Sequence, residues 1–153
     1  MTSITAMFLC FLALGGSVAV AADNTSTPKS RTGDPDQSPE PVAVMVGGEA
    51  EVDACGSLSK VSGLRKGGDG FLAVREAPNV RAREVDRLKN SEFVIECDAK
   101  GDWVGIVFEK SPAARKKHPT SCGTSSPKKE RGPYQGPCKS GWAHRKWITP
   151  EAG

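Results

Sequence analysis

The sequence predicts an all-β protein, a small five-stranded barrel that carries a long basic loop insertion. Its 153 residues include 17 glycines and 11 prolines but only 6% aromatic side chains, a composition that favours short strands and turns over helices. Short alternating apolar runs bounded by turn residues indicate the same class. The length is enough for one domain and a tail, which excludes large multidomain enzymes.

Residues 1–22 predict a signal peptide. They contain no charged side chain, and residues 7–14 (MFLCFLAL) are continuously apolar. Small residues precede two alternative cleavage points, after Ala21 and after Ala22. The alternative is a membrane anchor, but the apolar run is shorter than the ~20 residues of a spanning helix. We therefore expect a secreted or periplasmic protein with no transmembrane span after signal removal.

Residues 23–54 predict an acidic flexible linker. This stretch holds seven acidic and two basic residues, a net charge of −5, whereas residues 55–153 hold nineteen basic and eleven acidic residues, a net charge of +8. Residues 25–41 are rich in Ser, Thr, Pro and Asp and have no apolar period, so they cannot bury enough surface to offset the entropy lost on ordering. The folded domain is expected from residue 55 to residue 153.

Four cysteines remain after signal removal, and an even number in an exported chain indicates two disulfides. Three pairings are possible. We favour Cys55 with Cys97 and Cys122 with Cys138, because the latter pair closes a single irregular segment. In the chain-entropy model such loops contribute ~3–4 kcal/mol each, which is large for a small core.

A zinc site is the competing interpretation of these residues. His118 lies four positions before Cys122, and His144 lies six positions after Cys138, which are nearly ligand-like intervals. However, the usual pair of closely spaced thiolates is missing, and export favours oxidation. We expect no metal and no cofactor.

Two strands are expected in the first half of the domain. Residues 70–75 (GFLAVR) alternate, so Leu72 and Val74 should point inward. The pair at 90–91 (NS) then turns the chain into a second strand at residues 93–97 (FVIEC).

Three further strands complete the predicted barrel. Residues 103–108 (WVGIVF) form a hairpin with the preceding strand and place Val104, Ile106 and Phe108 on one stripe. Residues 141–149 (GWAHRKWIT) predict a short strand, a tight turn and a last strand. Five short antiparallel strands fit a small barrel.

Residues 109–140 predict a long basic loop insertion without a regular period. A solvated loop is the ordinary meaning of such a charge run. The same charges would also suit the phosphates of an anionic polymer or, less readily in an exported protein, of nucleic acid. The cationic side chains concerned are Lys110, Arg115, Lys116, Lys117, Lys128, Lys129 and Arg131.

Five short segments of the folded part together form a recognisable sequence pattern: residues 72–79 (LAVREAPN), 85–90 (VDRLKN), 101–107 (GDWVGIV), 141–144 (GWAH) and 147–148 (WI). In order and spacing they resemble a bacterial Src-homology-3-like (SH3-like) domain, over about residues 60–109 and 138–149. The cysteine-bearing segments at 122–123 and 136–142 further resemble small secreted members of this family, some of them carried as integron cassette proteins. The Asn-Ser pair, where Asn-Gly is usual, and the basic loop depart from the family pattern.

The resemblance implies a binding module, a half-open barrel whose aromatic groove lies between two loops. Bacterial members often sit in the cell envelope, and some recognise peptidoglycan peptides. By this resemblance Trp103, His144 and Trp147 line the groove, and Tyr134 in the basic loop is expected to fold over it. The alternative for Trp103 and Trp147 is that they only cover the barrel end.

We therefore expect a non-catalytic binding or scaffold module of the cell envelope that recognises a peptidoglycan peptide or an envelope protein. The alternative is contact with an anionic polymer or nucleic acid through residues 110–131. A Cys/His enzyme would need a reduced cysteine outside the cytoplasm. No paired carboxylates, Gly-x-Ser-x-Gly motif or phosphate loop is present, and the Gly-rich turn at 67–70 precedes a strand, so it lacks a helix dipole.

Overall fold

The computed structural model describes residues 38–65 and 67–151, in which every regular element is a strand or a short 3-10 turn. The fold is therefore all-β, as predicted. The predicted signal peptide and the predicted linker up to residue 37 lie outside the described residues. In the described part, no helix has the length and apolar character needed to cross a membrane.

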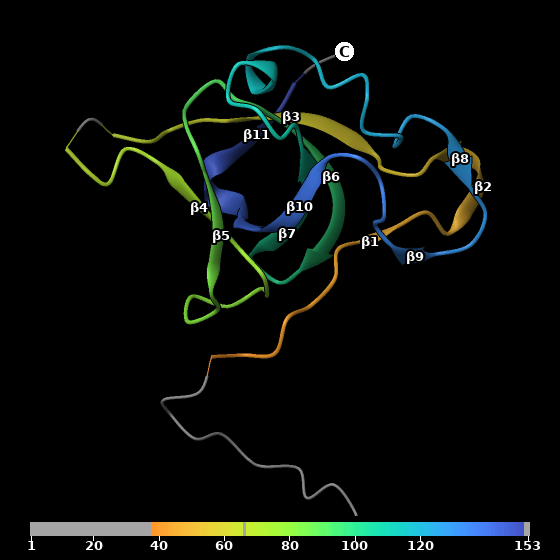
Figure 1. Cartoon of the computed structure of the whole chain (residues 1–153), viewed down its shortest axis with the longest axis horizontal. Coiled ribbons are helices and arrows are strands. Elements are labelled where there is room, and N and C mark those ends of the chain that lie inside the picture. The colour runs from red at the N-terminus through yellow and green to blue at the C-terminus, as the bar shows by residue number, and fades with distance from the viewer. Residues whose placement is uncertain (1–37, 66, 152–153) are drawn as a thin grey trace, which may run out of the picture. The chain divides into compact units, whose positions relative to one another are not determined.

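The principal sheet has seven antiparallel strands in the order β11-β3-β6-β7-β10-β4-β5 (Figure 1). The edge strands β5 and β11 do not pair with each other, so the sheet curves but remains open. In chain order the strands are β3 (Ser57–Val61), β4 (Leu72–Arg75), β5 (Glu84–Leu88), β6 (Phe93–Lys100), β7 (Trp103–Phe108), β10 (Lys139–His144) and β11 (Ile148–Pro150).

All five predicted strands occur in this sheet, as β4, β6, β7, β10 and β11. The predicted hairpin is formed by β6 and β7, which pair directly. The sequence does not predict β3 (SLSKV) and β5 (EVDRL). Their polar and charged side chains are half-exposed along most of each strand, so the apolar alternation that marks a strand is weak.

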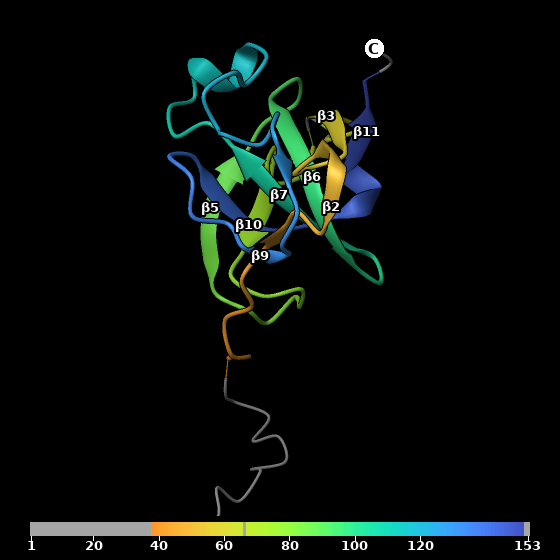
Figure 2. The same cartoon turned by 90° about the vertical axis from the view of Figure 1, so that its right-hand side faces the viewer.

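Two small sheets stand beside the principal one. β1 (Met45–Val46) pairs with β9 (Gly132–Pro133), and β2 (Glu49–Asp53) pairs with β8 (Pro127–Lys128). Figure 1 shows β2 and β8 as an arm at the side of the curved sheet, and Figure 2 views the molecule from that side. The predicted loop at 109–140 thus contains β8, β9 and the 3-10 turn η1 (Ala114–Lys116), and it pairs with the N-terminal strands.

The folded chain begins before the expected boundary at residue 55. Val44 and Val46 are only 2% and 5% exposed. The Val42 N–H donates to the Glu76 carbonyl at 2.8 Å, and the Tyr134 N–H donates to the Val44 carbonyl at 2.9 Å. The acidic composition of the expected linker conceals a short valine alternation, and those valines pack on the sheet.

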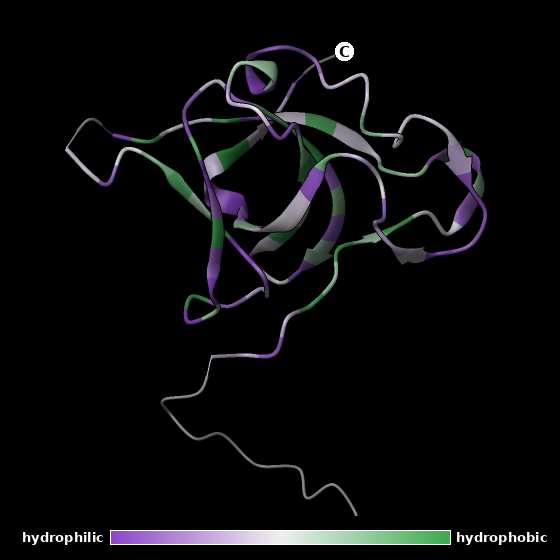
Figure 3. Ribbon diagram, in the orientation of Figure 1, coloured by the Kyte–Doolittle hydropathy of each residue, from purple (hydrophilic) through white to green (hydrophobic). Residues whose placement is uncertain are grey.

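The main core lies on the inner side of the curved sheet. Leu72 and Val74 are 4% and 0% exposed, which confirms the predicted inward direction. The predicted stripe of Val104, Ile106 and Phe108 is also buried in this core. Figure 3 shows the hydrophobic colour in β4 and in parts of β6, which also has hydrophilic stretches, whereas η1 is mostly hydrophilic. The remaining buried members are Val61, Leu88, Val94, Ala143 and Ile148.

A second apolar cluster contains both disulfides. Cys55 is bonded to Cys97 and Cys122 to Cys138, so the predicted pairing is confirmed. Ile95 of β6 and Val107 of β7 alternate with main-core residues and therefore face this second cluster. The two central strands are apolar on both faces because each face is covered.

Trp142 of β10 is fully buried and ties the N-terminal segment to the sheet. Its indole Nε1–H donates to the Val42 carbonyl at 2.7 Å. A buried indole N–H needs such an acceptor. Trp142 is therefore a structural residue that fixes the position of residues 42–46.

Candidate ligand-binding pocket

A pocket of about 620 Å³ is formed by residues 64–65 and 67–71, between β3 and β4, and by Trp147 of the 3-10 turn η2 (Arg145–Trp147). Leu64, Phe71 and Trp147 supply its apolar lining, and Arg65 and Asp69 supply charged groups. Backbone of the Gly-rich turn at 67–70 forms the rest. The volume and the mixture of aromatic and charged groups are those of a small-ligand site.

The connection between β3 and β4 is held in place by hydrogen bonds to distant segments. The Asn90 side chain binds both backbone groups of Leu64: its Oδ1 accepts from the Leu64 N–H at 3.1 Å, and its Nδ2 donates to the Leu64 carbonyl at 2.8 Å. The Ser62 N–H donates to the Trp147 carbonyl at 3.0 Å. Gly63 has a positive φ of 76°, and a Cβ there would lie 3.5 Å from the indole of Trp147.

Both aromatic rings of the pocket carry a cation. The Arg87 guanidinium lies 4.1 Å from the Phe71 ring centroid, and the Lys146 ammonium lies 4.9 Å from that of Trp147. With Arg65, three cations stand in or beside the pocket; Arg87 is paired with Glu84 at 2.5 Å, which leaves Arg65 and Lys146 against the carboxylate of Asp69. This balance favours a ligand that combines an apolar part with an anionic group.

The groove expected from the sequence is divided in the structure. Trp103 and His144 are paired across β7 and β10, and their ring centroids are 5.7 Å apart. His144 Nδ1 accepts from the Lys146 N–H at 3.2 Å, which starts η2. Trp147 instead lines the pocket with Phe71, and in residues 38–65 and 67–151 no ring contact joins it to Trp103.

Tyr134 does not cap an aromatic groove. Its hydroxyl donates to the Cys122 carbonyl at 2.8 Å and accepts from the Cys138 N–H at 3.1 Å, so it spans the loop closed by that disulfide. Burial raises the pKa of Tyr134 above its usual value of 10.0. A Cβ at Gly136 would collide with the phenol ring, which explains glycine at that position. Tyr134 belongs to the second apolar cluster.

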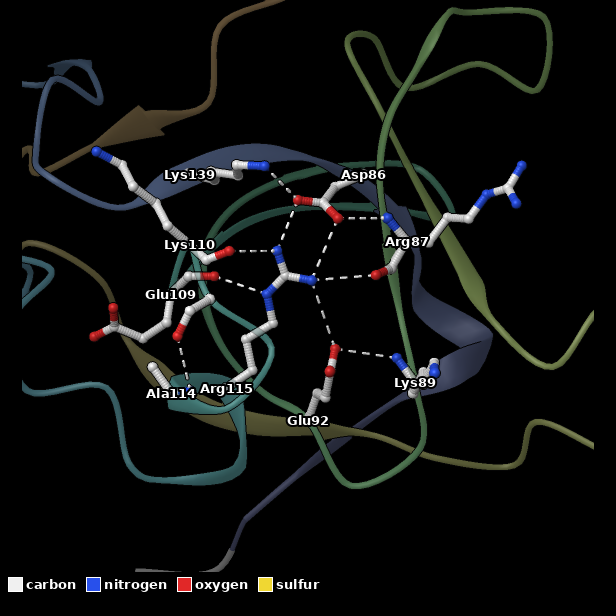
Figure 4. A network of polar contacts seen from close by, with 10 residues as sticks. Asp86, Arg87, Lys89, Glu92, Glu109, Lys110, Ala114, Arg115 and Lys139 are labelled. Carbon is white, nitrogen blue, oxygen red and sulfur yellow. Dashed lines mark hydrogen bonds and ion pairs between the residues drawn. The ribbon is translucent and has the colours of Figure 1, made fainter.

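Arg115 is a buried structural residue and not part of a basic surface. Only 3% of it is exposed. Its guanidinium donates to the carbonyls of Glu109 (2.7 Å), Lys110 (3.1 Å) and Arg87 (3.2 Å). It also donates to both carboxylate oxygens of Asp86, at 2.7 and 3.3 Å (Figure 4). These contacts fasten η1 to β5.

Asp86 is the acidic centre of this network. Lys139 also donates to it at 2.8 Å, and the Arg87 N–H does so at 2.7 Å. Partial burial raises its pKa, but the bonds from Lys139, Arg115 and the Arg87 N–H outweigh burial and hold the pKa below the ordinary 3.8. Glu92, itself buried, adds a second carboxylate 3.8 Å from Arg115.

The other cations of the predicted basic loop differ in their surroundings. Arg131 is paired with Asp98 at 2.6 Å, and Lys128 is half-buried. Lys110, Lys116, Lys117 and Lys129 are exposed. The expected basic surface is therefore smaller than the sequence indicates.

The zinc interpretation lacks the ligands it requires. Cys122 and Cys138 lie close to the Glu109 carboxylate, but their sulfurs are bonded to each other and are not thiolates. His118 stacks edge-on against Phe93, with ring centroids 4.6 Å apart, and does not join them.

The sequence does not predict Leu64 and Phe71 as pocket residues, although both line the pocket. Residues 67–70 are recognisable as a turn, and Phe71 follows them directly, but alternation assigns Phe71 only to the start of a strand. Its place opposite Trp147 depends on contacts between segments more than 70 positions apart, which no local pattern reveals.

No family model matches the chain, and no curated protein or solved structure matches it either. The geometry of the pocket and of the charged side chains is therefore what indicates a function.

Proposed function

We propose that this protein is a non-catalytic binding module of the cell envelope, and that the pocket lined by Phe71 and Trp147 holds a peptide bearing a carboxylate. The observation that carries the proposal is the pocket itself, in which two aromatic rings and Leu64 lie among cations. The stem peptides of peptidoglycan combine small apolar side chains with carboxylates, so they are the ligand class that this chemistry suits best. An envelope protein with an exposed acidic segment is the second member of the same class.

An SH3-like fold is part of the proposal. The strands β4, β6, β7, β10 and β11 follow one another as the resemblance implies, with η2 between the last two. The principal sheet has two further strands and is open, so the proposed domain is an elaborated form of the five-stranded barrel.

The proposal includes export of the protein to an oxidising compartment. Both disulfides are compatible with such a compartment, because cytosolic thiols are kept reduced. The apolar, uncharged sequence of residues 1–22 supports removal of a signal peptide there.

The proposal also holds that the protein does not act as a Cys/His enzyme. All four cysteines of the described chain are in disulfides, so a Cys/His pair has no thiolate to use. Within the same part of the chain, His144 is engaged with Trp103 and the Lys146 N–H, and His118 lies on Phe93. Neither imidazole is hydrogen-bonded to a hydroxyl that it would activate.

The test is calorimetric titration of the oxidised protein with a synthetic peptidoglycan stem peptide. Trp147→Ala and Phe71→Ala should each weaken binding at least tenfold, since a buried aromatic face is worth about 1.5–3 kcal/mol. Trp103→Ala is the matched control, because it removes a half-exposed tryptophan from the other aromatic site. It should change the affinity less than twofold.

Two outcomes would overturn the assignment. Loss of binding in Trp103→Ala alone would move the ligand to the Trp103–His144 pair. No binding by the wild-type protein would remove the stem peptide as the ligand. Thermal unfolding of each variant shows whether a loss reflects the site or the fold, because Trp147 also packs on the main core.

A further inference from the structure

We infer that Lys110, Lys116 and Lys117 form a second, separate binding surface, which docks a linear polyanion rich in phosphate in the cell wall. This surface lies on the segment that includes η1 and shares no residue with the aromatic pocket. It is named here the η1 surface. The inference goes beyond the proposed peptide site and does not depend on it.

Hydrogen bonds hold the backbone that carries the η1 surface. The Arg115 N–H donates to the Ser111 carbonyl at 3.1 Å, the Lys117 N–H to the Ala114 carbonyl at 3.0 Å, and the Ala114 N–H to Ser111 Oγ at 3.1 Å. The buried Arg115 side chain then fixes this turn to β5 (Figure 4). Binding to a preorganised turn loses little backbone entropy, which distinguishes these lysines from those of a free loop.

The lysines of the η1 surface are also electrostatically uncompensated. All three are exposed, and none has a carboxylate within 4.0 Å in the described part of the chain. The nearest acids of this region already have other partners. Asp86 is bound by Arg115 and Lys139, and Glu109 accepts from Ser121 Oγ at 2.7 Å. The carboxylates of Asp86 and Glu109 are therefore engaged by other donors, and the ammonium groups of the three lysines face solvent without a paired acid among the described residues.

The surroundings favour a soluble or wall-bound polymer over a lipid surface. Among the described residues the large hydrophobic side chains with high exposure are Val52 and Val80, and neither belongs to the segment around η1. Proteins that lie on membranes usually insert apolar side chains beside their cations. Single-stranded nucleic acid requires aromatic platforms for stacking, and residues 109–117 contain none.

The test measures binding of fluorescently labelled linear polyphosphate by anisotropy between 0.05 and 0.3 M salt, a range set by the expected screening on the order of 10 Å. The variant Lys110→Gln/Lys116→Gln/Lys117→Gln should bind about tenfold more weakly at low salt. Its slope of log affinity against log salt should fall by about 2, as loss of three phosphate contacts requires. The control is Lys89→Gln/Lys100→Gln/Lys129→Gln, which removes the same charge from three other exposed sites and should stay within about twofold of wild type.

Equal weakening in both triple variants would overturn the inference, because only net charge would then matter. Tighter binding to anionic vesicles or to single-stranded DNA than to polyphosphate at the same salt would overturn the ligand class. Unchanged thermal unfolding of the first variant is expected, because Arg115 and its partners are retained. Polyphosphate binding that survives Trp147→Ala would show that the two surfaces act separately, and binding abolished by Trp147→Ala would contradict a separate η1 surface.

Discussion

Ser91 occupies a backbone conformation that glycine adopts more easily than serine. It is the one non-glycine residue with a positive φ in residues 38–65 and 67–151, at 68°. Its N–H donates to the Val61 carbonyl at 2.8 Å, and the turn that it forms carries Asn90, which supports Leu64 in the pocket wall. A side chain in the left-handed region costs about 1–2 kcal/mol.

Ser91→Gly should therefore raise the free energy of unfolding by about 0.5–1 kcal/mol, since the relief of this cost exceeds the extra entropy that glycine loses on folding. Urea denaturation measures the change. Ser125→Gly is the matched control, because Ser125 is exposed and has no positive φ. It should be neutral or destabilising by up to about 1 kcal/mol. If Ser91→Gly is no more stable than Ser125→Gly, the turn is not strained.

At the scale of elements, the Arg115 network determines how η1 covers the edge of the sheet. β5 is an edge strand, and edge strands expose backbone groups that invite pairing with other chains. Arg115 satisfies the Arg87 carbonyl of this strand at 3.2 Å. Because Asp86 holds Arg115 in place, the charge state of Asp86 connects the two elements.

The lowered pKa of Asp86 predicts a defined pH dependence. A carboxyl whose pKa is lower in the folded state stabilises the fold above its unfolded pKa, near 3.8, and this contribution is lost as the pH falls through the folded pKa. At pH 7, Asp86→Asn should lower the free energy of unfolding by about 1.5–3 kcal/mol, through weaker bonds to Arg115 and Lys139. The difference from wild type should shrink below about pH 4.

Urea denaturation between pH 7 and pH 2 checks this prediction. Glu51→Gln is the control, because Glu51 is exposed and its side chain makes no hydrogen bond or ion pair with the other residues that the structure describes. Its curve should run parallel to that of the wild type. A difference between Asp86→Asn and wild type that is the same at pH 2.5 and pH 7 would show that the ionised carboxylate is not what stabilises the network.

At the scale of the whole molecule, local patterns predict the central strands and the disulfides well. Leu72, Val74 and the stripe of β7 follow a period of two because one face of each strand packs in the main core. The cysteine pairing follows from the even count and the irregular segment between Cys122 and Cys138. The strand pattern is encoded within a few residues and the disulfides in a count of four cysteines, so a sequence reveals them.

Features that depend on distant contacts could not be predicted. Val44 and Val46 stand in an acidic stretch that composition assigns to a linker, and only the sheet reveals their burial. From the sequence, Arg115 is expected to be a solvent-exposed cation of the basic loop, but in the structure it is buried and bound to Asp86. The resemblance predicts a groove position for Trp147, which lines the pocket, but Phe71 of the same pocket is supplied by a loop that local alternation does not position.

The three tryptophans provide the most direct test of the aromatic pocket as the ligand site. Each indole N–H has a distinct environment: Trp142 is bonded to the Val42 carbonyl, Trp103 lies beside His144, and Trp147 lines the pocket. A two-dimensional NMR titration with a peptidoglycan stem peptide should shift the Trp147 indole signal and leave those of Trp103 and Trp142 nearly unchanged. A shift of the Trp103 signal without one of Trp147, or no shift of any indole at saturating peptide, would contradict the account.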